Sequence, residues 1–331
     1  MTRKINNSYL LGQSNAPATG GDMLKTRSDG TLAWEEVDGT DYIPIVWYGS
    51  RGIFSGGEAA SGNVNIIDYI TIQSAGNATD FGDLTAVTNS VNGGASDGSR
   101  GVIGKGTGTS MDMDYITIAT TGNATDFGDY TVGRANVAYC ANGVRGVIGG
   151  GQTVGTNVIE YITIATTGNA TDFGDRTVSG YGASAVADST RAVFVGGHDS
   201  GKTNVMDYVT IASTGNATDF GDLQAAIYLC GSTSDTTRGV FAGGSTGSLV
   251  DTIQYITIQT TGNSTDAGNL SSARYELAGC GDASRAVFGG GYDSNKTNTM
   301  EYVTIQSTSN VTDFGDLSSA RQMQGGSCSG D

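Results

Sequence analysis

From Arg51 onward, short apolar runs alternate with turns rich in Gly, Ser, Thr and Asn. Along Met300–Ile305, Tyr302 and Thr304 fall on one face of an extended chain, and apolar residues fall on the other. Apolar groups on both faces predict a strand in a sheet that is covered on both sides. The surrounding stretch predicts four strands, over Ala273–Cys280, Arg285–Phe288, Met300–Ile305 and Val311–Leu317.

This four-strand pattern recurs six times. Each copy opens with Arg, a small residue and a hydrophobic residue, contains Tyr-(Ile/Val)-Thr-Ile or a variant, and closes on Gly-Asn-Ala-Thr-Asp-Phe-Gly-Asp or a variant. The spacings are 49, 45, 46, 47 and 47 residues between the opening arginines Arg51, Arg100, Arg145, Arg191, Arg238 and Arg285. Four strands in a period of this length are typical of a β-propeller blade, which buries its faces against neighbouring copies.

The predicted fold is therefore all-β: a six-bladed β-propeller over residues 41–331, preceded by an attachment segment over residues 1–40. Arg321–Cys328 is a seventh copy of the first strand. We expect it to pair beside Arg51–Ser55 and to close the ring. The alternative closing strand is Ile43–Tyr48, but Pro44 lacks an N–H for the strand ladder.

Two further features recur in the copies. Glycine doublets follow the second predicted strand at Gly56-Gly57, Gly149-Gly150, Gly196-Gly197, Gly243-Gly244 and Gly289-Gly290. An acidic residue precedes Tyr at Asp68-Tyr69, Asp114-Tyr115, Glu160-Tyr161, Asp207-Tyr208 and Glu301-Tyr302. With the arginines, these features make the unit resemble a Kelch-type repeat. It departs from the Kelch pattern at Gly104-Lys105-Gly106, at Gln254-Tyr255, and at the fourth-strand tryptophan, which is Phe or, at Ala267, Ala.

The composition narrows the class of partner. The chain has 331 residues with a formal charge of −16, which repels phosphate backbones and anionic lipid surfaces. We therefore expect no nucleic-acid partner and no membrane insertion. Met1–Ala16 has no hydrophobic signal-peptide core, so we expect the protein to stay where it is made or to leave by a route such as lysis.

The cysteines occupy one segment of their repeats and form no Cys-x-x-Cys pair, so neither a zinc site nor a redox motif is indicated. They are Cys140, Cys230, Cys280 and Cys328. Small buried residues on an inner strand and a disulfide between adjacent units both remain open.

Several repeated motifs resemble functional sites. Asp-Phe-Gly occurs in five units, which favours a buried Phe followed by Gly at a bend over a kinase metal site. Asn-x-(Ser/Thr) sequons begin at Asn77, Asn123, Asn169, Asn216, Asn263 and Asn310, and favour turns in which Gly and Asn take positive φ. Aspartate pairs recur at Asp80/Asp83, Asp126/Asp129, Asp172/Asp175, Asp219/Asp222 and Asp313/Asp316. Calcium ligation, turn capping and ion pairs with the repeated arginines are the alternatives for them.

His198, the single histidine, lies in a polar loop and is expected at an exposed loop tip. Gly104–Thr109 looks like a phosphate loop but lacks the G-x-x-x-x-G-K-(S/T) order. No catalytic residue, cofactor site or metal site is therefore predicted.

The loops after the second strand differ between units, and function on a repeat scaffold usually lies in such variable loops, although ordinary solvated loops have the same composition. They are Glu58–Asn63, Thr107–Ser110, Gln152–Asn157, His198–Asn204, Ser245–Ser248 and Tyr292–Thr299. Their Ser, Thr, Asn and Gly content favours recognition of a hydroxylated surface such as polysaccharide.

Met23–Thr26 and Leu32–Val37 predict a hairpin around a turn at Ser28–Thr31. The string Gly-Asp-Met-Leu-Lys-Thr-Arg-Ser-Asp-Gly-Thr-Leu-Ala-Trp resembles segments of bacteriophage fibre and other virion proteins, and the repeats resemble those of marine phage structural proteins. This resemblance implies a virion location, attachment to other virion proteins through residues 1–40, and a homo-oligomer.

The expected function is thus a phage tail fibre, spike or surface decoration that displays the propeller for host attachment, by binding a host glycan or receptor. Pure structural decoration of capsid or tail, and a cellular Kelch-like protein-interaction module, are the alternatives. An enzyme of the propeller oxidase or glycosidase kind ranks third, because the repeats contain no unique cluster of catalytic residues.

Overall fold

The computed structural model describes residues 22–26, 32–36, 49–88, 93–105, 112–152, 156–322 and 327–330. The chain divides into two compact units, Met1–Ile43 and Pro44–Asp331. In the first unit, β1 (Asp22–Thr26) pairs antiparallel with β2 (Leu32–Glu36), at the positions predicted for the two arms of a hairpin. The predicted turn at Ser28–Thr31 lies outside the described residues.

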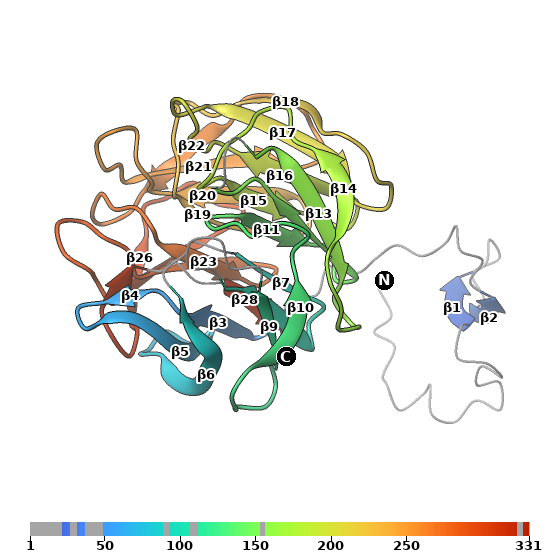
Figure 1. Ribbon diagram of the computed structural model, residues 1–331, viewed down its shortest axis with the longest axis horizontal. Coiled ribbons are helices and arrows are strands. Elements are labelled where there is room, and N and C mark those ends of the chain that lie inside the picture. The colour runs from blue at the N-terminus through green and yellow to red at the C-terminus, as the bar shows by residue number, and fades with distance from the viewer. Residues whose placement is uncertain are drawn as a thin grey trace, which may run out of the picture. The chain divides into compact units, whose positions relative to one another are not determined.

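The second unit is a six-bladed β-propeller, as predicted: six small antiparallel sheets form a ring, and the regular elements described are strands (Figure 1). Blades 2 to 6 have four strands each. In chain order these are β7 (Gly94–Ser96), β8 (Arg100–Gly104), β9 (Asp112–Thr117) and β10 (Thr125–Asp129); β11 (Ala138–Ala141), β12 (Arg145–Gly149), β13 (Val158–Thr163) and β14 (Thr171–Asp175); β15 (Ser184–Ala187), β16 (Arg191–Val195), β17 (Val205–Thr210) and β18 (Thr218–Asp222); β19 (Gly231–Ser234), β20 (Arg238–Ala242), β21 (Thr252–Thr257) and β22 (Thr265–Asn269); and β23 (Ala278–Gly281), β24 (Arg285–Gly289), β25 (Thr299–Thr304) and β26 (Thr312–Asp316).

Blade 1 combines two distant parts of the chain. Its own strands are β3 (Arg51–Ser55), β4 (Glu58–Ala59), β5 (Gly62–Thr71) and β6 (Thr79–Thr88). The inner strand is β28 (Ser327–Gly330), which pairs antiparallel with β3. Another strand, β27 (Arg321–Gln322), pairs with β4. The predicted closing segment Arg321–Cys328 thus divides between two ladders, while the alternative Ile43–Tyr48 lies outside the described residues.

The first strand of blade 6 begins later than the sequence pattern indicates. The pattern predicts a start at Ala273, but β23 starts at Ala278. The residues between them belong to the linker from blade 5, where Glu276 has a φ of 56° that turns the chain into the inner strand. Apolar composition alone did not distinguish this linker from a strand.

The repeated arginines join neighbouring blades. Each guanidinium carbon lies 3.9–4.5 Å from the ring centroid of the third-strand Tyr in its own blade. Nη1 of each donates a hydrogen bond of 2.7–3.1 Å to an Ile carbonyl in the next blade. Arg285 bonds Ile72 in this way and so continues the pattern across the closure of the ring. These contacts combine a cation–π interaction with a charge-assisted hydrogen bond.

The Gly-Asn-Ala-Thr-Asp-Phe-Gly-Asp motif forms a second joint between blades. The Asn263 side-chain oxygen accepts a 3.0 Å hydrogen bond from the N–H of Asp222 in the preceding blade, and all six sequon asparagines make the equivalent bond at 3.0–3.1 Å. Gly221 has a φ of 141°, and a Cβ there would lie 2.5 Å from the carbonyl oxygen of Gly262. The motif's two glycines therefore meet across the joint.

The roles expected for this motif are partly confirmed. Its phenylalanines are buried, at 2% exposure, and each contacts the Tyr of its blade edge-on with ring centroids 6.0–6.3 Å apart. The expectation of positive φ at the asparagines is wrong: among the described residues other than glycine, only Asn136, Leu229 and Glu276 have it. The asparagines act through their side chains instead.

A buried acidic side chain forms a third joint. The acid or amide before each third-strand Tyr accepts a backbone N–H from the linker or last strand of the preceding blade, at 2.8–3.3 Å. In five blades it also pairs with a cation at 2.7–3.1 Å. These ion pairs are Asp68–Arg321, Asp114–Lys105, Glu160–Arg134, Asp207–Arg176 and Glu301–Arg274. Lys105, from the segment that looked like a phosphate loop, therefore balances a buried charge.

Charge is balanced separately in each blade. The cations come from different positions of the repeat. Arg176 stands one residue before Thr177, whose N–H binds the acid, whereas Arg274 stands three residues after Ser271, the equivalent donor. In blade 5 the position of Arg274 is held by Ile227, and there the acid is replaced by neutral Gln254. Burial raises the pKa of Glu160 even though Arg134 and the Thr131 N–H oppose the shift. An acid without a cation at this position would be strongly disfavoured.

We expect Gln254→Glu to lower the free energy of unfolding by about 3 kcal/mol at neutral pH, because it buries an unpaired carboxylate. Burial raises the folded-state pKa of the new carboxyl, as it does for Glu160. The loss of stability is therefore small below the pKa of the glutamate in the unfolded chain, about 4.3. It grows as the pH rises towards the pKa of the carboxyl in the folded protein. Urea unfolding at pH 5 and pH 8 measures the difference.

The double variant Gln254→Glu with Ile227→Arg provides the control. The carbonyls of Ile227 and Arg274 accept equivalent hydrogen bonds, from Gly197 and Gly244 at 2.9 Å each, so an arginine at 227 reproduces the arrangement of blade 6. Recovery of stability supports local charge balance. If Gln254→Glu alone is as stable as wild type at pH 8, local charge balance is contradicted.

Candidate functional site

One end of the propeller carries both the loops after the second strands and the linkers between blades; we call it the linker face. At this end five linkers pair with the loop beside them in the part of the chain that the structure describes. Isolated bridges join Ala135 to Gln152, Tyr181 to His198, Tyr228 to Ser245 and Tyr275 to Tyr292. In blade 1, Gln322 and Glu58 form the corresponding pair between β27 and β4. The loops therefore differ in sequence between blades, but their backbones pair with the linkers at equivalent positions.

Five partly exposed rings lie on this face, Tyr181, His198, Tyr228, Tyr275 and Tyr292, and we call them the aromatic arc. The His198 ring lies 5.4 Å from Tyr181 and 5.3 Å from Tyr228, centroid to centroid, and those two tyrosines are 6.3 Å apart. The rings of Tyr275 and Tyr292 are 5.8 Å apart. The arc spans the linkers and loops of blades 4 to 6.

His198 is not the exposed loop tip that was expected. It is partly buried between tyrosine rings, and its Nδ1 is buried without a hydrogen-bond partner. The Nζ atom of Lys202, in the same loop, lies 6.0 Å from the centroid of the Tyr228 ring. A histidine in a polar stretch becomes partly buried here because the linkers on either side supply rings.

Immediately after the linker residues Ala135, Tyr181, Tyr228 and Tyr275, the chain turns into the inner strands through left-handed residues. Asn136, Gly182, Leu229 and Glu276 have φ values of 56–64°. Their backbones are linked in series, because the N–H groups of Gly182, Leu229 and Glu276 donate to the preceding member at 2.7–2.9 Å. Left-handed conformation at a leucine is strained, and strained backbone of this kind clusters at functional sites.

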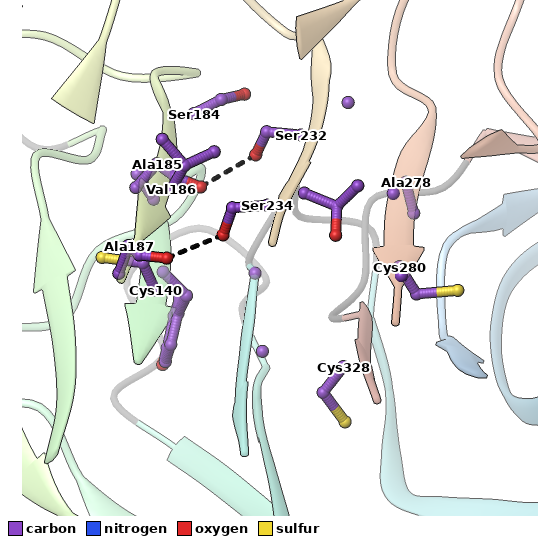
Figure 2. Close-up of a pocket in the computed structure, with 18 of the residues that line it drawn as sticks. Cys140, Ser184, Ala185, Val186, Ala187, Ser232, Ser234, Ala278, Cys280 and Cys328 are labelled. Carbon is purple, nitrogen blue, oxygen red and sulfur yellow. Dashed lines mark hydrogen bonds between the residues drawn. The ribbon is translucent and has the colours of Figure 1, made fainter. Parts of the chain in front are cut away.

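Beyond these turns, an axial cavity of about 150 Å³ runs among the inner strands β7, β11, β15, β19, β23 and β28 (Figure 2). Its walls are formed mostly by Gly, Ala, Ser, Thr, Val and Cys residues, with Tyr139 and Leu277 as the larger side chains. Ser232 and Ser234 donate hydrogen bonds of 3.0 and 2.8 Å to the carbonyls of Ala185 and Ala187, which tie β19 to β15 (Figure 2). The cavity has room for several waters.

All four cysteines line this cavity as free, buried thiols with 2–7% exposure. This matches the first of the two interpretations, small buried residues on an inner strand. In Figure 2 the sulfur atoms of Cys280 and Cys328 point away from Ser232 and Ser234. A Cβ on Gly101 would lie 2.6 Å from Sγ of Cys328, so the small residue after the repeated arginine makes room for the preceding blade's inner strand.

The aspartate pairs lie on the fourth strands. In the first pair Asp80 is exposed and Asp83 is partly buried, and the ladder places them opposite Asp68 and Ile66. No group of three or more His, Cys, Asp or Glu residues suited to a metal ion occurs in the described part of the chain. The repeated arginines contact tyrosine rings and carbonyls, as described above.

Sequence reasoning identified the variable loops but missed the linker tyrosines. Tyr181, Tyr228 and Tyr275 each lie ten residues before the arginine of the following blade, a position held by Ala135 in an earlier copy. Tyr275 lies within the predicted first strand Ala273–Cys280, and no role was predicted for the other two. Their regular recurrence was the available signal. Of the predicted loops, Thr107–Ser110 lies outside the described residues.

Comparison of the sequence with protein-family models and with curated proteins gives no match. Over the residues that the structure describes, no helix has the length and apolar character needed to cross a membrane. The propeller is assigned from its sheets and their order. The resemblances to Kelch repeats and to phage virion proteins rest on the motifs quoted from the sequence.

We expect the native protein to react with no thiol equivalent in a DTNB assay, and with four after unfolding in guanidinium. Burial raises the pKa of Cys230 to about 11 and that of Cys328 to about 12. It also raises the pKa values of Cys140 and Cys280. The reactive thiolate is therefore scarce, and reagent access is blocked. Rapid reaction of even one native thiol would contradict this packing.

Proposed function

We propose that the chain is a bacteriophage-type virion protein whose propeller binds a glycan on the host cell surface through the linker face. The observation that carries the proposal is the aromatic arc, a set of partly exposed rings on the face whose loops differ between blades. Elsewhere the blades repeat the same joints. The variable, ring-bearing face is thus the best candidate for recognition.

The chemistry of this face matches that of a sugar. A pyranose ring has an apolar C–H face that stacks on aromatic rings and a rim of hydroxyls that need hydrogen-bond partners. Tyr228 and Tyr275 offer both a ring and a hydroxyl. The loops of blades 4 to 6 on this face supply Ser, Thr and Asn side chains together with Lys202. Weak contacts of this kind gain strength when many copies act together.

The proposed activity is binding without turnover. In the axial cavity the thiols have raised pKa values, and hydroxyls such as Ser232 and Ser234 donate to backbone carbonyls within the fold. The setting on a virion is supported by the resemblance of the string Gly-Asp-Met-Leu-Lys-Thr-Arg-Ser-Asp-Gly-Thr-Leu-Ala-Trp, within residues 1–40, to segments of virion proteins. Through that segment the chain would bind other virion proteins and form a homo-oligomer.

We expect Tyr228→Ala to weaken glycan binding by about tenfold to 100-fold, because it removes the ring shared by the linkers and loops of blades 4 and 5. The measurement is binding of wild type and variant to an oligosaccharide array, followed by titration of the best ligand. Val144→Ser is the control, since Val144 is exposed in a first-to-second-strand turn, away from the linker face. If Tyr228→Ala and wild type bind the ligand with equal affinity, the aromatic arc is not the binding site.

The virion location is tested by immunogold electron microscopy with antibody against residues 44–331. Gold at fibre tips on particles from the source is the expected result. Gold over the head or tail shaft favours decoration without host binding. Absence of gold from particles that contain the protein's gene contradicts the virion assignment and favours a cellular interaction module.

A further inference from the structure

Almost all lysines and arginines of the propeller unit have a partner within the fold. Pro44–Asp331 contains thirteen of these residues, and the structure describes all of them. The six repeated arginines contact tyrosine rings and Ile carbonyls, as described above. Six more residues form ion pairs: Lys105, Arg134, Arg176, Arg274, Lys296 and Arg321. The ammonium group of Lys202 is the one that forms no ion pair or hydrogen bond with the described residues.

The equivalent lysine of blade 6 shows which partner Lys202 lacks. Blades 4 and 6 read His-Asp-Ser-Gly-Lys-Thr-Asn and Tyr-Asp-Ser-Asn-Lys-Thr-Asn from His198 and Tyr292, and an isolated bridge joins each lysine to the first residue of its loop. Nζ of Lys296 reaches blade 1 and lies 2.9 Å from Oε1 of Glu58. The loop of blade 6 thus presents its lysine to a carboxylate on the neighbouring blade.

Lys202 reaches towards blade 5 in the same way but meets no acid there. A Cβ on Gly247 of that blade would lie 3.2 Å from its Nζ atom. The residue that corresponds to Glu58 is Ser245, because both pair with the linker beside them. The ammonium group of blade 4 therefore lacks the carboxylate that its counterpart in blade 6 has.

The surroundings of this ammonium group lie at the surface of the linker face. Lys202 is partly exposed, and Thr246, Gly247 and Ser248 beside it are exposed. The Nζ atom also lies 6.0 Å from the centroid of the Tyr228 ring, which belongs to the aromatic arc. A ligand can therefore approach the cation from solvent and needs no cavity.

We propose that Lys202 binds the carboxylate of an acidic sugar, a uronic acid, and that this ligand supplies the partner that Glu58 supplies to Lys296. The inference rests on the proposed glycan-binding function and specifies its ligand class and its charged residue. The ammonium group donates hydrogen bonds to the carboxylate oxygens, and such bonds are stronger than those between neutral groups. The exposed hydroxyls of Thr246 and Ser248 are available to the hydroxyls of the sugar.

The negative charge of the chain restricts this ligand to direct contact with the lysine. The formal charge is −16, and the acid of the same loop, Asp199, accepts a 2.8 Å hydrogen bond from Ser179. At physiological ionic strength, repulsion by exposed charges more than about 8 Å away is largely screened. We therefore expect weak binding at each site that depends on the single ammonium group.

The test is Lys202→Gln, which removes the charge and keeps a polar side chain. We expect it to bind a uronate oligosaccharide about tenfold more weakly than wild type by titration calorimetry. The probe is the uronate ligand that wild type binds best on an array of neutral, uronate-bearing, sulfated and phosphorylated oligosaccharides. Because Lys202 has no acidic partner in the fold, the melting temperature should equal that of wild type.

The carboxyl-reduced form of the same oligosaccharide tests the ligand's side of the contact. Wild type should bind this neutral form about as weakly as Lys202→Gln binds the acidic form. The variant should not distinguish the two forms. Lys296→Gln is the matched control, because its ammonium group occupies the same loop position but is already paired with Glu58. It should bind the acidic form with wild-type affinity.

Wild-type affinity in Lys202→Gln, or an equal loss in Lys296→Gln, overturns the site and leaves the proposed function standing. Binding of wild type to neutral oligosaccharides alone overturns the ligand class. Preference for sulfated or phosphorylated ligands overturns the choice of a carboxylate. If wild type binds no glycan, the proposed function fails, and this inference fails with it.

Discussion

Each blade of this propeller buries its faces against neighbouring blades, so the polar groups that a repeat brings to those faces need partners in another copy. Three joints meet this requirement: the arginine that bonds an Ile carbonyl, the sequon asparagine that accepts an N–H, and the buried acid that accepts another. The donors and acceptors are displaced by one blade rather than paired within it. A single copy would leave these groups unpaired, which explains why the motif is maintained through the array.

The fold could be predicted because period and strand alternation are properties of the sequence alone. The contacts between blades could not be predicted, because the sequence of a repeated motif is the same whether its partner lies in its own copy or in the next. Asn263 illustrates this: the sequence indicated a turn residue, and the structure shows a side chain bound to Asp222 of the preceding blade. The linker tyrosines were missed for a related reason, since Tyr275 looks like part of a strand until the left-handed Glu276 is known to end the linker.

Blade 5 is where the repeat departs furthest from its own pattern. Gln254 replaces the buried acid, Ala267 replaces the buried phenylalanine, and Ser245 replaces the ring of the neighbouring loops. The first of these changes has a structural explanation, because the matching cation is also absent from position 227. The change at Ser245 has a local explanation as well, because its Oγ accepts a 3.1 Å hydrogen bond from the N–H of Gly247 in the same loop.

The pairing of β28 with β3 also constrains how the molecule is made. Residues 51–55 are among the first of the propeller to leave the ribosome, and residues 327–330 are among the last. Until residues 327–330 emerge, the first blade therefore lacks its inner strand, and the edge of β3 remains open to incorrect pairing. The later blades can complete their own sheets as they emerge. Closure of the ring consequently waits until two distant segments of the chain find each other.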